Sequence, residues 1–171
     1  MTTETAIRTA QKALDIAWDG KLPIDPTAIA RSLQVTNGDS RLAIIMEGDP
    51  SLGPHSGQAE YVMAPGGDYY RCTYNSREAS YRQQFTKAHE LGHVLMGHVV
   101  PGKSPKRDTT FNAPAGDWDE VDANAFAAEL LMPKDYVIQM ANKVTNISKL
   151  AEIFGVSPTA IRYRLQNLGL L

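Results

Sequence analysis

Disulfide bonds are the first feature that this sequence lacks, because Cys72 is its only cysteine. Proteins without disulfides are typical of reducing compartments. A run of about 18 apolar residues is also absent, which argues against a membrane-spanning helix. The first twenty residues contain no continuous apolar segment of the kind found in signal peptides. Together these absences predict a cytoplasmic protein with no membrane association.

An excess of basic residues is missing as well. The 17 lysines and arginines are balanced by 19 aspartates and glutamates, which gives a formal net charge of −2 at pH 7. Broad binding to nucleic acid requires a basic face, so this balance argues against that function and leaves only a local basic patch open. The length of 171 residues and the hydrophobic content of 43% are those of a soluble protein with one main domain and a real core.

The N-terminal part of the chain carries helical signals. Apolar residues recur at helical spacing over residues 5–18 and predict an amphipathic helix. Asp25 followed by Pro26 is a typical pair of N-cap and first helical residue, which predicts a second, short helix through Leu33. We expect both helices to serve packing.

A small sheet is predicted after these helices. Arg41–Met46 is a short apolar run with strand character, and Glu47–Gly57 is rich in turn residues. Ala59–Met63 and Tyr69–Tyr74 are β-rich runs joined by a Pro-Gly-Gly-Asp turn, which predicts a hairpin. The expected result is a small antiparallel sheet, whose edge strand can bind an extended peptide through main-chain hydrogen bonds.

The most informative stretch begins at Ser80. Ser80 and Gln83 have the spacing of a capping box, which predicts the start of a helix. Within that helix, His89, Glu90 and His93 form the pattern His-Glu-x-x-His. Residues four apart lie on one helix face, one turn apart, so the two imidazoles can bind a single zinc ion. Glu90 lies one step round and can reach an activated water as its general base.

The rest of the chain contains a long loop and further helical signals. The proline- and glycine-rich stretch Val99–Gly116 is long for a connection in a compact domain. Asp117 is an N-cap candidate for a helix predicted from Trp118 to Leu131. A helix, a turn and a second helix, which Ser157 and Pro158 begin, follow before the end of the chain.

Three segments together resemble the ImmA/IrrE family of zinc metallopeptidases. They are RQQFTKAHELGHVLMGH (Arg82–His98), VDANAFAAELLMP (Val121–Pro133) and KLAEIFGVSPTAIRYRL (Lys149–Leu165). The resemblance implies an α+β fold with a gluzincin-like zinc metallopeptidase core, a small antiparallel sheet and a C-terminal helix-turn-helix-like element. Residues 1–144 would then form the metallopeptidase domain with its N-terminal helices, and residues 145–171 the C-terminal element packed on it.

The resemblance also implies the third zinc ligand. Members of the family usually have Glu-Ala-Asn before a Phe-Ala pair, and the corresponding acidic residue here is Asp122, whose side chain is one methylene shorter. The implied cofactor is therefore Zn²⁺, held by His89, His93 and Asp122, with Glu90 as the catalytic residue.

Other residues near this motif have expected roles. Glu120 is the fallback ligand, but it lies about 200° round the helix from Asp122 and is expected to point away. Glu129 lies two turns beyond Asp122 and is expected to pair with a basic side chain or to orient a ligand histidine. An oxyanion requires a donor, for which the candidates are Tyr74, Tyr81 and His98.

The implied function is a zinc-dependent endopeptidase that cleaves a cytoplasmic helix-turn-helix transcriptional repressor and so relieves repression. The alternative is a non-catalytic regulatory protein, an antitoxin or anti-repressor, that acts by binding a partner. Direct DNA binding ranks below both of these, because the last helix of this acidic chain offers few groups for base readout. Those groups are Arg162, Arg164, Gln166 and Asn167. We expect this helix pair to pack on the core.

Overall fold

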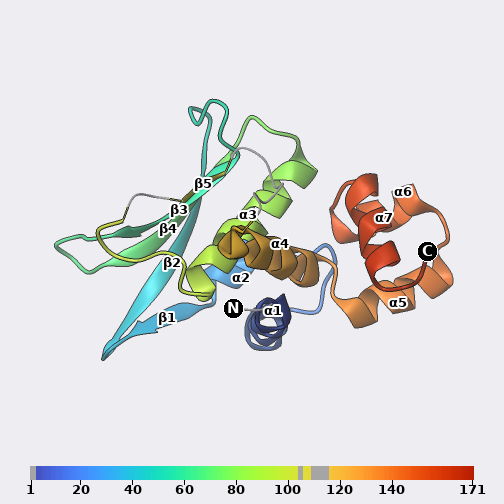
Figure 1. Cartoon of the computed structure of the whole chain (residues 1–171), viewed down its shortest axis with the longest axis horizontal. Helices are drawn as coiled ribbons and strands as arrows, with labels where there is room; N and C mark the ends of the chain where they lie inside the picture. The colour runs from blue at the N-terminus through green and yellow to red at the C-terminus, as the bar shows by residue number, and fades with distance from the viewer. Residues whose placement is uncertain (1–2, 104–105, 109–115) are drawn as a thin grey trace.

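The computed structural model describes residues 3–103, 106–108 and 116–171. These residues form seven helices and a five-stranded sheet (Figure 1). The elements follow in the order α1 (Thr3–Ala17), α2 (Pro26–Arg31), β1 (Gln34–Asn37), β2 (Ser40–Asp49), β3 (Gly57–Val62), β4 (Tyr69–Asn75), α3 (Ser80–Leu95), β5 (Lys106–Asp108), α4 (Trp118–Leu131), α5 (Lys134–Lys143), α6 (Ile147–Phe154) and α7 (Pro158–Asn167). The fold is thus a mixture of helices and strands, as predicted.

The sheet has the strand order β1-β2-β4-β3-β5. The predicted hairpin is confirmed, because β3 and β4 pair antiparallel with Gly57 opposite Tyr74. The prediction of a purely antiparallel sheet is wrong, because β2 and β4 pair in parallel, with Ile44 opposite Tyr70. Turn residues reveal a hairpin between neighbouring runs, but they carry no information about a pairing that skips over a strand. Strands β1 and β5 lie outside the predicted strands: β1 forms a hairpin with β2, and β5 falls within the stretch predicted to be a long loop.

Helices α3 and α4 lie between the sheet and the C-terminal helices α5–α7 (Figure 1). Helix α3 packs on β3 and β4 through one face and on α4 through another. The close approach of α3 and α4 depends on Gly92, because a Cβ atom there would lie 2.8 Å from Cδ1 of Phe126. Helix α1 covers another face of α4 with a row of small buried residues, Ala6, Ala10 and Ala13.

Most of the predicted helix starts are confirmed by side-chain caps. The side chains of Asp25, Asp117 and Ser157 accept hydrogen bonds from backbone N–H groups in the first turns of α2, α4 and α7. The capping box at Ser80 is wrong in detail, since Ser80 is already helical and its helix has no side-chain cap. Gln83 instead donates its amide to the carbonyls of Ser76 and Glu78, at 3.2 and 2.7 Å.

The C-terminal helices are joined to the rest of the molecule by polar and apolar contacts. Helix α6 ends at Gly155, which has a φ of 66°, and a short turn leads into α7. Arg164 of α7 donates its Nε–H to the Met132 carbonyl at 2.9 Å and forms an ion pair with Glu129 of α4. The pairing of Glu129 with a basic side chain is thus confirmed. No helix in the described part of the chain combines the length and hydropathy needed to cross a bilayer.

Candidate metal centre

Helix α3 places the two histidines of the motif together in the interior. His89 and His93 have no exposed surface, and their rings lie edge to face with centroids 4.7 Å apart. Their Nε2 atoms are 3.1 Å apart. The four-residue spacing on one helix face therefore directs both ring nitrogens to the same place, as the sequence predicts.

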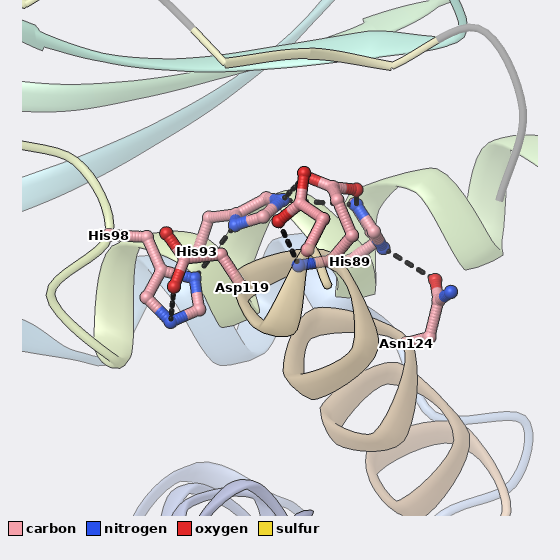
Figure 2. Close-up of polar contacts among 7 residues, drawn as sticks. His89, His93, His98, Asp119 and Asn124 are labelled. Carbon is pink, nitrogen blue, oxygen red and sulfur yellow. Dashed lines mark hydrogen bonds and ion pairs between the residues drawn. The ribbon is translucent and has the colours of Figure 1, made fainter. Parts of the chain in front are cut away.

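A carboxylate from α4 joins the two imidazoles. One Glu120 oxygen lies 3.1 Å from His89 Nε2, and the other lies 3.1 Å from His93 Nε2. Each of the three residues offers one ligand atom, and these atoms all lie within 4.8 Å of one another. Figure 2 shows the two histidines converging at the start of α4. The three side chains form a candidate metal site.

Asp122 is not part of this cluster. Its side chain is buried, and neither of its carboxylate oxygens has a hydrogen-bond partner. The expectation that Glu120 points away from the histidines is wrong, because the first turn of α4 faces the motif helix. Acidic residues occupy positions 119, 120 and 122, and the packing of α4 on α3 selects among them. The contact of Phe126 with Gly92 helps to fix that packing. Nothing in the local sequence predicts this contact.

The outer nitrogens of both histidine rings are also engaged. Asn124, one turn after Glu120, accepts a hydrogen bond from His89 Nδ1 at 2.9 Å. The Nδ1 atoms of His93 and His98 are 2.9 Å apart, and His98 Nε2 lies 3.5 Å from an oxygen of Asp119 (Figure 2). Such contacts fix the orientation of an imidazole, and a bond from His89 Nδ1–H leaves its Nε2 lone pair for a metal.

The three predicted oxyanion donors lie in different surroundings. His98 faces His93 and Asp119. Tyr74 lies beneath the ammonium group of Lys87, which is 4.4 Å from the ring centroid. Tyr81, near the start of α3, is half exposed. The sequence missed the structural role of His98, although its spacing of five residues from His93 places it just past the end of the same helix.

Glu90 lies on the sheet side of α3 and has no exposed surface. Gly57 of β3 allows this close approach, because a Cβ atom there would lie 3.0 Å from Glu90 Oε1 and 2.5 Å from Thr86 Cγ2. Glu90 also lies close enough to Cys72 of β4 to affect the pKa of its thiol. Burial raises the pKa of the Cys72 thiol well above its usual value, and the Glu90 carboxylate adds to this effect. The Cys72 thiol is therefore protonated at neutral pH.

The edge of β3 beside Glu90 is already occupied. Strand β5 pairs antiparallel with β3, with Asp108 opposite Gly57 and Lys106 opposite Ala59. The sequence predicted an edge strand that could bind an extended peptide. An incoming peptide could take this edge of β3 only in place of β5, or it could pair with β5 itself.

Replacement of Gly57 tests the close approach of β3 to α3. Gly57→Ala should lower the free energy of unfolding by about 1–3 kcal/mol, because the added methyl group overlaps Thr86 and the Thr73 carbonyl. The measurement is urea unfolding followed by circular dichroism. Gly66→Ala is the control, since nothing lies within 4 Å of its added Cβ. Equal stability of the two variants would contradict the steric role of Gly57.

Two buried histidines and a carboxylate on two packed helices define a candidate metal centre of the metallopeptidase type. The sequence profile of the IrrE N-terminal-like domain, a peptidase family, matches residues 51–166. This match covers more than half of the chain, so the protein belongs to that family. It includes α3, α4 and every residue of the cluster described above. No curated protein matches the sequence.

Proposed function

We propose that the protein is a zinc-dependent endopeptidase in which His89, His93 and Glu120 hold the metal. The three contacts of 3.1 Å between their donor atoms support this assignment. Bonds of about 2.0–2.1 Å to a tetrahedral ion would separate ligand atoms by about 3.3 Å. The two Nε2 atoms are 3.1 Å apart, close to this separation, and one ligand atom from each of the three residues lies within 4.8 Å of the others. Three protein ligands leave a fourth position open, which is the pattern of catalytic zinc sites.

The residues around the site have distinct tasks in peptide hydrolysis. Zinc, when bound, would polarise the scissile carbonyl and make water more acidic. Glu90 accepts a proton from the attacking water at a carboxylate oxygen and delivers it to the leaving amine. Asn124 and His98 hold the rings of His89 and His93 in the orientation that ligation requires. Glu90 has no exposed surface, and Gly57 of β3 lies against its carboxylate, which limits its contact with bulk water.

The proposed substrate is a cytoplasmic protein, a helix-turn-helix transcriptional repressor, whose cleavage relieves repression. Family membership and the resemblance of the three sequence segments to ImmA/IrrE peptidases support this part of the proposal. The competing function is regulation by binding alone. A base beside the metal is not needed for binding, so the presence of Glu90 next to His89 favours hydrolysis.

Glu90→Gln separates the two functions. The purified wild-type protein should contain one zinc per chain and cleave a repressor encoded beside its gene. Glu90→Gln should keep the zinc and lower the cleavage rate by about 10²–10⁴-fold, because an amide cannot accept the proton. Elemental mass spectrometry measures the zinc content, and mass spectrometry of the peptide products measures cleavage. Full zinc content with tight repressor binding and no cleavage by the wild type would support the binding function instead.

A further inference from the structure

A cleft of about 720 Å³ lies between α3, α4 and α7. Phe85 of α3, Asn124 and Ala128 of α4, and Ala160 and Tyr163 of α7 contribute to its walls. Its volume lies within the range of pockets that bind small organic groups. The C-terminal helix α7 therefore does more than pack on the core, since it forms one wall of a space beside the catalytic helices.

The cleft adjoins the candidate metal centre on the Nδ1 side of the His89 ring. Asn124 lines the cleft, and the same side chain accepts the hydrogen bond from His89 Nδ1 at 2.9 Å. Phe85 also lines it, and its ring centroid is 6.3 Å from that of His89. A peptide whose main chain passes the metal centre could therefore place a neighbouring side chain in this space.

The lining favours an apolar occupant. Ala125, Ala128 and Ala160 have short side chains that leave room in the cleft, and two aromatic residues stand at its rim. These are Tyr81, which is 49% exposed, and Tyr163, which is 63% exposed. Half-exposed aromatic rings beside a cleft provide apolar surface for a ligand to cover.

The two arginines of the lining do not select an acidic occupant. Arg164 is buried and is paired with Glu129 and with the Met132 carbonyl. Arg82 donates from Nη2 to Ser56 Oγ at 3.2 Å, and its Nε lies 3.9 Å from an oxygen of Glu78. Both guanidinium groups thus already have partners of their own within the protein.

We propose that this cleft binds one large apolar side chain of the peptide substrate, of the size of leucine, methionine or phenylalanine, next to the scissile bond. The inference rests on the proposed function and names the class of side chain that the site selects. It assigns α7 the role of a specificity wall, with Ala160 and Tyr163 as the residues that determine which side chain fits.

The test uses two ligands that share a zinc-binding group. Acetohydroxamic acid carries no side chain, and N-hydroxy-3-phenylpropanamide carries a phenyl ring on a short linker. Isothermal titration calorimetry of the zinc-loaded full chain should give a Kd about ten- to a hundredfold lower for the phenyl compound, because the ring leaves water for an apolar cleft. Succinic acid monohydroxamate, which has a carboxylate in place of the ring, should show no such gain.

Variants of α7 test whether the phenyl ring binds in this cleft. Ala160→Phe fills the cleft, so the ratio of the two Kd values should fall close to one. Tyr163→Ala removes part of the rim and should lower the ratio several-fold. This variant replaces Ala160→Phe as the test if Ala160→Phe does not fold. Gln166→Phe adds the same ring at an exposed position of α7 outside the cleft. The ratio of the two Kd values should therefore stay at its wild-type value.

The outcomes separate this inference from the proposed function. If neither hydroxamate binds the zinc-treated protein, the metal site itself is absent and both proposals fail. If both bind equally well, the metal site stands and the apolar subsite is overturned. A phenyl gain that survives in Ala160→Phe would place the ring elsewhere and overturn the assignment to this cleft. A dimer in sedimentation that the phenyl compound dissociates would make a second copy the occupant, which also overturns it.

Discussion

Glu120→Ala is expected to leave the purified protein with almost no zinc. Glu120 contacts both His89 Nε2 and His93 Nε2 at 3.1 Å, so its removal leaves only two ligands. Since altering even an outer partner of a metal ligand costs about 10–100-fold in affinity, loss of the ligand itself should cost more than 100-fold. Zinc content after gel filtration and competition with a chromophoric chelator measure this loss.

Asp122→Asn is the matched control, because it removes a neighbouring carboxylate with almost no change in volume. Asp122 lies outside the cluster, so this variant should retain one zinc per chain and the wild-type affinity. Near-ultraviolet circular dichroism checks that both variants keep their packing. Zinc loss in Asp122→Asn, together with zinc retention in Glu120→Ala, would restore Asp122 as the third ligand.

Glu129→Ala should strongly destabilise the protein. The Glu129 and Arg164 side chains are only 4% and 10% exposed, and Glu129 also accepts a hydrogen bond from Gln11 at 3.3 Å. Removing the carboxylate leaves a buried guanidinium without its counter-charge, which costs about 3–5 kcal/mol of unfolding free energy. Urea unfolding at neutral pH measures the difference.

Two further variants test whether the unpaired charge causes that loss. Glu152→Ala removes an exposed carboxylate from α6 and should change the stability by no more than about 0.5 kcal/mol. The double variant Glu129→Met with Arg164→Met replaces the ion pair by apolar side chains and should recover most of the stability. A loss below about 1 kcal/mol in Glu129→Ala would mean that Arg164 finds solvent or another partner.

The features that the sequence predicted correctly depend on neighbouring residues. A cap such as Ser157 acts on the backbone three residues later, and the spacing of His89 and His93 is a property of one helix. The hairpin of β3 and β4 likewise depends on a turn between adjacent runs. In each case a few consecutive positions contain all the information required.

The features that the sequence missed depend on contacts between distant segments. Glu120 faces the histidines because α4 packs on α3 in one register, in which Phe126 lies against Gly92. Gly57 stood at the end of a turn-rich stretch, yet in the structure it is a strand residue pressed against Thr86 and Glu90. A parallel pairing such as that of β2 with β4 has no local signal either.

The first fifty residues contribute a strand and two helices that pack against the region matched by the family profile. A fragment limited to residues 51–166 would lack β2, which lies between β1 and β4 within the sheet. It would also lack α1, and the face of α4 that Ala6, Ala10 and Ala13 cover would become exposed to water. We therefore expect the cooperative unit of folding to extend beyond the matched region, so that truncation at its boundaries would destabilise the candidate metal centre.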